Sequence, residues 1–281
     1  MNGTGFVLAL SGGVGGAKLA LGLYRILPPG ALTVVANTGD DFEHLGLSIS
    51  PDIDTLLYTL AGLDNPELGW GRRDESWTFM TALGDLGGET WFNLGDGDLA
   101  THVERTRRLA AGASLSGITD DFRRRLGISA RLLPMSDDRV RTRLRTAEGW
   151  LDFQDYFVRL RCAPVVREIA FAGAETARPQ PAFLAALANE NLRAVVICPS
   201  NPFISIDPIL SLPGVRDALR VCPAPVVAVS PIIGGKAVKG PTGKMMTELG
   251  LPVTLARTLM SSLEDREVLS RVVLEAAGRG F

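Results

Sequence analysis

Short apolar runs bounded by turn residues recur along this chain of 281 residues. Most of them lack the alternation of polar and apolar residues that marks a half-exposed strand, so they predict strands buried on both faces of a parallel sheet. The six runs are FVLALS (6–11), LTVVAN (32–37), ARLLPM (130–135), VVREIAFAG (165–173), RAVVICPS (193–200) and APVVAVSP (224–231).

Helical patterns lie between several of these runs and at the end of the chain. They are GAKLALGLYRIL (16–27), PAFLAALANENL (181–192), VRDALRV (215–221) and SSLEDREVLSRVVLEAA (261–277). Strands that alternate with helices predict a Rossmann-like, doubly wound α/β fold with a mostly parallel sheet.

The stretch from 56 to 128 interrupts this alternation. It carries three of the four tryptophans and a charged segment, LATHVERTRRLAAGASLSGITDDFRRRLG (99–127), whose pattern predicts two amphipathic helices. We therefore expect a single α/β domain over 1–281, in which a Rossmann-like core (1–55 and 129–281) carries a mainly helical insertion (56–128).

Composition narrows the class of function. A net charge of −2 and a pI near 5.8 leave no basic surface for nucleic acid. The amino terminus lacks the features of a signal peptide, and no apolar run approaches the length of a membrane span. The three cysteines, Cys162, Cys198 and Cys222, have no metal-like spacing and suit reduced thiols. We expect a soluble, cytoplasmic enzyme that contacts neither nucleic acid nor membrane.

A glycine-rich turn follows the first predicted strand and opens a helix. The segment SGGVGGAK (11–18) contains Gly12, Gly13, Gly15, Gly16 and Lys18. Glycines let backbone N–H groups approach a ligand, and the helix N-terminus attracts anions, so the turn predicts a phosphate or nucleotide site. It matches neither the P-loop spacing nor the full dinucleotide fingerprint, and a plain tight turn remains the alternative.

Four aspartates follow the second predicted strand within the segment NTGDDFEHLGLSISPDIDT (37–55). Asp40 and Asp41 end the strand, and Asp52 and Asp54 open the next helix. Asp52 next to Pro51 also fits an ordinary helix-capping pattern. Asp40 and Asp54 come from two loops at one sheet edge, and such carboxylates are ligands that Mg²⁺ prefers.

Polar residues gather at three further places. GDGD (95–98) precedes His102 and Arg105 on one helical face, where they could meet an anionic group, although a capped turn explains the GDGD segment equally well. Ser200 and Asn201 end one strand, and the segment SPIIGGKAVKGP (230–241) ends another. Doubly wound folds bind ligands at such strand ends.

Nine motifs in this order resemble the 2-phospho-L-lactate transferase family (CofD-like) of coenzyme F-420 biosynthesis. They are SGGVGGAK, NTGDD, SPDIDTLLYTLAG, WGRRDESW, WFNLGDGDLATH, LPMSDD, FQDYFV, PSNPFISIDPIL and SPIIGGKAVKGP. The resemblance implies a Mg²⁺-dependent transfer of a 2-phospholactyl or phosphoenolpyruvyl group. The donor would be a guanosine diphospho compound, the acceptor the deazaflavin Fo and the by-product GMP, and the protein would be a homodimer. The chain departs from the pattern after 254, where the last helix follows sooner than in similar proteins.

The resemblance also implies roles for individual residues. Asp40 and Asp54 would hold Mg²⁺, with Asp41 or Asp52 as the base or a supporting group, and the tryptophans of the insertion, Trp70, Trp77 and Trp91, would suit stacking on a flat acceptor. The residues expected around the nucleotide are Gly12, Gly13, Gly15, Gly16, Lys18, Ser200, Asn201, Gly234, Gly235 and Lys236. Two alternatives remain, a nucleotide-sugar-binding regulator of the related gluconeogenesis-factor-like branch and an unrelated nucleotide-sugar glycosyltransferase.

Overall fold

A five-stranded parallel sheet forms the centre of the protein, seen here in a computed structural model that describes residues 5–67, 70–231, 254 and 256–278. Its strand order is β10-β9-β1-β2-β5 and every neighbouring pair is parallel. The strands are β1 (Phe6–Ser11), β2 (Leu32–Ala36), β5 (Arg131–Pro134), β9 (Leu192–Ile197) and β10 (Val226–Ala228). The predicted Rossmann-like, mostly parallel α/β fold is confirmed.

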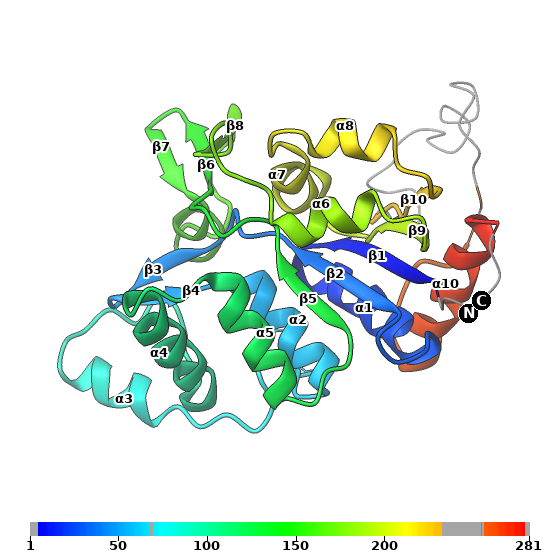
Figure 1. Cartoon of the computed structure of the whole chain (residues 1–281). Helices are drawn as coiled ribbons and strands as arrows, with labels where there is room; N and C mark the ends of the chain where they lie inside the picture. Colours follow the sequence, from blue (N-terminus) through cyan, green and yellow to red (C-terminus); the bar gives the residue numbers. More distant parts are fainter. Residues whose placement is uncertain (1–4, 68–69, 232–253, 255, 279–281) are drawn as a thin grey trace.

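Helices cover both faces of this sheet (Figure 1). Alternate residues of β1 pack to opposite sides: Val7 and Ala9 join one apolar cluster, and Leu8 and Leu10 join the other. The first cluster is completed by α1 (Gly13–Ile26), α2 (Pro51–Ala61) and α10 (Leu263–Ala276), and the second by α6 (Pro181–Leu187), α7 (Asp207–Leu210) and α8 (Val215–Arg220). Burial on both faces explains why β1, β2, β5 and β9 are mostly apolar, whereas the edge strand β10 is apolar but largely exposed among the described residues.

The order of the strands creates a switch point beside β1. The chain passes from β1 to β2 and β5 on one side, and β9 and β10 lie on the other side. The chain after β1 leads to α1 on one face of the sheet, and the chain after β9 leads to α7 and α8 on the other face. Doubly wound folds bind ligands at this place.

Residues 56–128 carry most of the remaining helices. These are the end of α2, then α3 (Thr78–Asp85), α4 (Asp96–Ala110) and α5 (Leu115–Arg125). The two helices expected from the charged segment correspond to α4 and α5. An antiparallel hairpin, β3 (Phe42–His44) with β4 (Leu47–Ile49), joins β2 to α2 and packs beside α4 (Figure 1).

One predicted strand was placed wrongly. The run 165–173 forms β8 (Glu168–Ala172), which belongs to a separate antiparallel sheet with β6 (Arg141–Thr146) and β7 (Gly149–Asp152) instead of the parallel sheet. Its side chains are half-buried or exposed, because this small sheet stands away from the core (Figure 1). A π-helical turn (Asp155–Arg159) follows β7.

The contact between α1 and α10 generates a stability prediction. A Cβ atom at Gly22 of α1 would collide with the backbone carbonyl of Arg266 in α10. We expect Gly22→Ala to lower the free energy of unfolding by about 1–3 kcal/mol, the usual cost of overpacking. Gly84→Ala on exposed α3, where the new atom meets only Thr90 at 3.6 Å, should instead be neutral or stabilising. Denaturant unfolding of both variants checks this, and equal stabilities would contradict it.

Candidate active site

A cavity of about 780 Å³ opens at the carboxyl edge of the parallel sheet. The glycine turn after β1, the segment after β9, the start of α2 and the insertion contribute to its walls. Four aspartates line it, namely Asp40, Asp52, Asp54 and Asp98. Among the lining residues that the structure describes there is no lysine or arginine, so the cavity carries an excess of carboxylates.

The glycine turn is held by protein groups. Gly12 N–H donates to Ser200 Oγ at 3.2 Å, and Gly13 N–H donates to Asp52 Oδ1 at 2.6 Å. Asn37 at the end of β2 donates its side-chain N–H to the other oxygen of Asp52 at 2.9 Å. Asp52 therefore joins β2, α2 and the glycine turn, whereas the cap position of its own helix is occupied by Ser50.

The other glycines of the turn serve close packing. A Cβ at Gly15 would lie 2.5 Å from the carbonyl oxygen of Pro199, and one at Gly16 would meet the hydroxyls of Ser11 and Ser200. Gly13 differs, since its φ of +64° is left-handed and nothing lies within 4 Å of a Cβ there. The turn thus faces the cavity at Gly13 and packs against the β9 segment at Gly15 and Gly16.

The remaining residues expected around the nucleotide occupy different places. Ser200 and Asn201 line the large cavity, and the Asn201 side chain accepts the N–H of Phe203 at 3.0 Å. Lys18 lines a separate hollow of about 160 Å³ beside Ser230 and Met260. The glycine–lysine segment with Gly234, Gly235 and Lys236 lies outside the described residues.

Asp40 carries a carboxylate that lacks full compensation. It is buried, and its Oδ1 atom has no hydrogen-bond partner among the described residues. Burial raises the pKa of Asp40 well above its usual value, and the nearby charges of Asp52 and Asp41 raise it further. An orphaned oxygen between like charges fits a cation ligand, so Asp40 suits the predicted Mg²⁺.

Asp41 faces a different space. Ser50 Oγ donates to its Oδ2 atom at 2.8 Å, and burial raises its pKa to about 7 against the opposing charge of Arg141. Asp41 lines a hollow of about 180 Å³ that also contains Arg139 and Arg141. Asp41 is not among the residues that line the large cavity, which weakens the expectation that it acts as the base.

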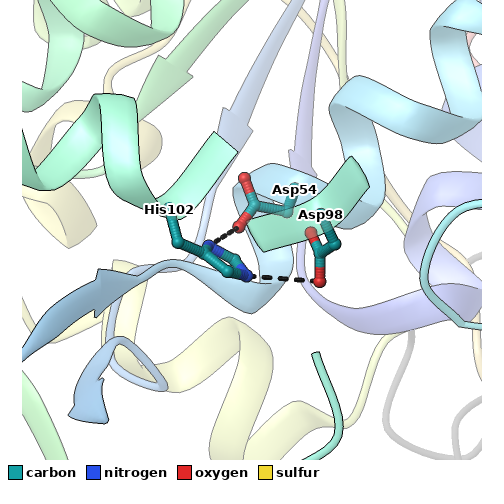
Figure 2. Close-up of side chains that lie close together, drawn as sticks. All are labelled: Asp54, Asp98 and His102. Carbon is teal, nitrogen blue, oxygen red and sulfur yellow. Dashed lines mark ion pairs between the residues drawn. The ribbon is translucent and has the colours of Figure 1, made fainter. Parts of the chain in front are cut away.

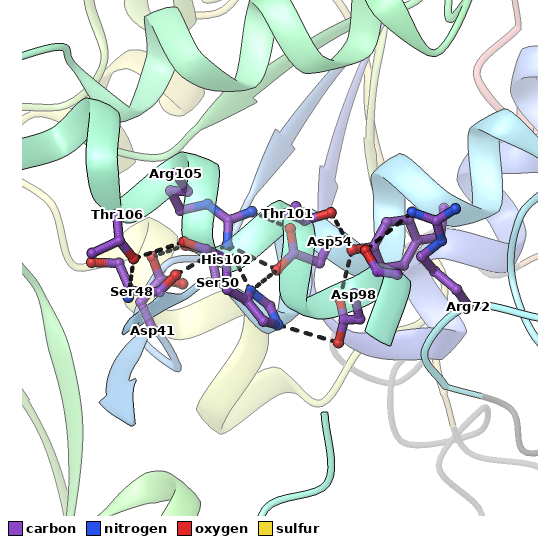
Figure 3. Close-up of polar contacts among 12 residues, drawn as sticks. Asp41, Ser48, Ser50, Asp54, Arg72, Asp98, Thr101, His102, Arg105 and Thr106 are labelled. Carbon is purple, nitrogen blue, oxygen red and sulfur yellow. Dashed lines mark hydrogen bonds and ion pairs between the residues drawn. The ribbon is translucent and has the colours of Figure 1, made fainter. Parts of the chain in front are cut away.

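Asp54 is already paired with a buried cation. Both of its oxygens accept hydrogen bonds from the guanidinium of Arg105, which is itself almost completely buried (Figure 3). Arg105 Nη1 also lies 3.3 Å from His102 Nδ1, and this nitrogen is 3.6 Å from Asp54 Oδ2 (Figure 2). Asp54 can offer a metal only its remaining lone pairs, so it fits Mg²⁺ less well than Asp40 does.

Aromatic rings form an apolar part of the cavity. Trp70 and Trp91 line it, together with Phe153 and Phe157, whose rings stack at 5.4 Å between centroids. Trp77, the third tryptophan of the insertion, is not among the lining residues and precedes α3. The sequence motif FQDYFV (153–158) contained the phenylalanines, but only the fold brings them to the cavity.

Comparisons with known proteins agree on one family. A family model described as 2-phospho-L-lactate transferase CofD matches residues 7–277. A curated protein of Kitasatospora aureofaciens named phosphoenolpyruvate transferase is 44% identical over 254 residues, covering 88% of this chain and 78% of the relative. A protein of the same name from Mycobacterium tuberculosis is 40% identical over 270 residues, covering 89% of this chain and 81% of the relative.

A solved structure shows a related fold. An X-ray crystal structure of a Bacillus halodurans protein matches with a TM-score of 0.57 at 16% sequence identity, covering 80% of this chain and 68% of that one. At this identity the match concerns the fold alone.

The buried ion pair makes Asp54 and Asp52 distinguishable. We expect Asp54→Asn to lower the free energy of unfolding by about 3–5 kcal/mol, because it leaves the buried Arg105 charge unpaired. Asp52→Asn removes a carboxylate whose partners are neutral donors and should cost about 1 kcal/mol. Urea unfolding of the two variants in metal-free buffer measures the difference. Equal losses of unfolding free energy in the two variants would show that the ion pair with Arg105 does not stabilise the protein more than the neutral contacts of Asp52 do.

Proposed function

Because the chain belongs to the 2-phospho-L-lactate transferase CofD family, we propose that it transfers a phosphoenolpyruvyl or 2-phospholactyl group from a guanosine diphospho donor to the deazaflavin Fo, with release of GMP. The cavity is the observation that carries this proposal. Its size suits a nucleotide-sized ligand, and it lies at the switch point where doubly wound folds bind nucleotides.

The lining residues of the cavity suit different parts of the two substrates. The glycine turn, Ser200 and the aspartates match phosphates and their counterions. Trp91 and the stacked pair Phe153 and Phe157 match the flat ring system of a deazaflavin. Both sets line one cavity, so the terminal hydroxyl of the acceptor would meet the donor phosphorus inside it.

A divalent cation is part of the proposal. A donor with a diphosphate is strongly anionic, and the described lining of the cavity supplies carboxylates without lysine or arginine. We propose that Asp40 and Asp54 hold Mg²⁺. Because Arg105 already binds the carboxylate of Asp54, Asp52 is the alternative to Asp54 as the second ligand. When bound, Mg²⁺ would neutralise charge on the phosphoryl oxygens.

The relatives favour one donor over the other. The curated relatives at 40–44% identity carry the name phosphoenolpyruvate transferase. We therefore propose that the enolpyruvyl donor is preferred and that the phospholactyl donor is the weaker substrate. A homodimer in the cytoplasm remains our expectation for the assembly and its location. Among the described residues, no helix has the length and apolar character that a membrane crossing requires.

The regulator alternative has less support. It rests on a shared fold, and the structural match at 16% identity carries no information about activity. The transferase proposal rests in addition on a family model that spans residues 7–277.

Turnover with both donors tests the proposed function. We expect the purified protein with Mg²⁺ to convert Fo and the guanosine diphospho donor of phosphoenolpyruvate into a phosphorylated deazaflavin and GMP, and to use the phospholactyl donor more slowly. Chromatography of the deazaflavin and GMP products measures both rates. Thermal stabilisation by the donor without any product would instead favour a binding protein.

Metal binding can be tested without turnover. We expect Mg²⁺ to raise the melting temperature of the protein in the presence of GDP, since a ligand at 100 times its dissociation constant adds about 2.7 kcal/mol of stability. Asp40→Asn should abolish this shift while making the metal-free protein more stable, because it removes a poorly compensated buried carboxylate. Asp138→Asn, at a half-buried aspartate that pairs with the exposed Arg178 and does not line the cavity, is the control that should keep the shift. An undiminished shift in Asp40→Asn would contradict the metal assignment.

A further inference from the structure

Asp98 lies between Tyr58 and His102, and part of its side chain stays open to the cavity. Tyr58 donates its hydroxyl to Asp98 Oδ1 at 2.6 Å. His102 Nε2 lies 3.2 Å from Asp98 Oδ2 (Figures 2 and 3). The side chain of Asp98 keeps 16% of its surface exposed, whereas His102 behind it keeps 2%. Of the side chains of Asp98 and His102, that of Asp98 is therefore the more accessible from the cavity.

His102 lies between Arg105 and Asp98. Arg105 Nη1 is 3.3 Å from His102 Nδ1, and Nε2 is 3.2 Å from Asp98 Oδ2. A guanidinium has donors only, so a neutral ring that accepts from Arg105 at Nδ1 carries its proton on Nε2, the nitrogen on the Asp98 side. The ion pair of Arg105 with Asp54 fixes the guanidinium and with it the orientation of the imidazole.

The other three aspartates that line the cavity have different surroundings. Asp52 accepts from the glycine turn and from Asn37. Asp54 accepts from Arg105 through both oxygens. Asp40 has the orphaned oxygen that suits a cation. Asp98 remains as a carboxylate with an exposed edge and no cationic Lys or Arg bonded to it.

The surroundings of Asp98 also fit the acceptor. Asp98 lies in the first turn of α4, a few residues after Trp91, Phe92 and Asn93 of the cavity wall. Burial works to raise the pKa of Asp98, but the contacts with His102 and Tyr58 outweigh it and the pKa lies below its usual value. The group is consequently ionised at neutral pH and able to accept a proton.

We propose that Asp98 is a catalytic residue that holds the attacking hydroxyl of the acceptor and takes its proton, with His102 and Tyr58 as the residues that position it. This inference rests on the proposed transferase function. It assigns the base to the insertion instead of to Asp41 or Asp52, the two residues suggested by the sequence.

The step balances without a further reactant. The acceptor oxygen forms a bond to the phosphorus that carries the enolpyruvyl or lactyl group, and the bond from this phosphorus to the bridging oxygen of the diphosphate breaks. The electron pair of that bond stays on the departing GMP. The proton of the hydroxyl passes to Asp98, which a bulk water can later deprotonate. The base acts by holding the hydroxyl in line with the phosphorus and by taking its proton as the new bond forms.

Asp98→Asn is the decisive variant, since it keeps the shape of the side chain and removes the proton acceptor. We expect kcat to fall about 10²–10⁴-fold, the usual contribution of a general base, whereas GDP binding by calorimetry and Fo binding by equilibrium dialysis stay near native. Single-turnover rates with pre-bound donor keep product release out of the measurement. Asp98→Glu should recover part of the lost rate.

The positioning residues have their own readout. Tyr58→Phe removes one hydroxyl, and His102→Gln keeps an N–H donor but loses the fixed ring. Each should lower kcat about 10-fold or more with little change in the KM of either substrate, because a base displaced by about 1 Å loses much of its effect. Asp96→Asn is the matched control, an aspartate two residues away that bonds Ser76 and the first turn of α3. It should lower stability and leave kcat near native.

The outcomes separate this inference from the proposed function. A native protein that forms no deazaflavin product overturns both. An active native protein whose Asp98→Asn variant keeps a kcat within about 5-fold overturns Asp98 as the base, since a general base contributes more. A variant that loses Fo binding while kcat at saturation is unchanged shows a binding residue instead. Loss of folding in Asp98→Asn leaves the decision to Tyr58→Phe, whose unchanged kcat would also reject the inference.

Discussion

A fully buried guanidinium, Arg105, sets the geometry of the cavity wall. Burying such a charge costs several kcal/mol unless a partner of opposite charge and matching shape accompanies it. Asp54 supplies that partner from α2, so the charge can be buried only if α4 lies against α2 in one position. The same guanidinium orients His102, which in turn faces Asp98. One ion pair thus joins the insertion to the parallel sheet and aligns the side chains proposed to face the acceptor.

The aspartates at the sheet edge show the opposite balance. Asp40 and Asp52 are buried near each other, and their pKa values are raised by burial first of all. Asp52 is offset by donors at both of its oxygens, but Asp40 keeps an unpartnered oxygen, and its charge destabilises the metal-free protein. A ligand that binds this carboxylate and compensates its charge explains why Asp40 is present. The proposed cation does so, and it also accounts for a phosphate site whose described walls contain no lysine or arginine.

The sequence predicted the sheet better than the site. Strands buried on both faces are read from continuous apolar runs such as LTVVA, and the fold class followed from their alternation with helices. The run 165–173 was misplaced because apolar content does not state which sheet a strand joins. His102 and Arg105 were expected on one helical face beside an anionic group. That this group is Asp54, 51 residues away from Arg105, follows only from the packing of α4 on α2.

The glycine turn resembles a phosphate-binding motif, but two of its backbone N–H groups already donate to protein side chains. Glycine turns before a helix commonly bind phosphate through free N–H groups and the helix dipole. Here the N–H of Gly13 already donates to the carboxylate of Asp52 at 2.6 Å, and the N–H of Gly12 donates to Ser200. A carboxylate therefore occupies the position that an anion would take at the start of α1 and uses part of the helix dipole. Binding of a diphosphate beside this carboxylate requires added positive charge, so the turn and the proposed cation depend on each other. The turn provides shape and a rigid edge, and the attraction for phosphate comes from the metal.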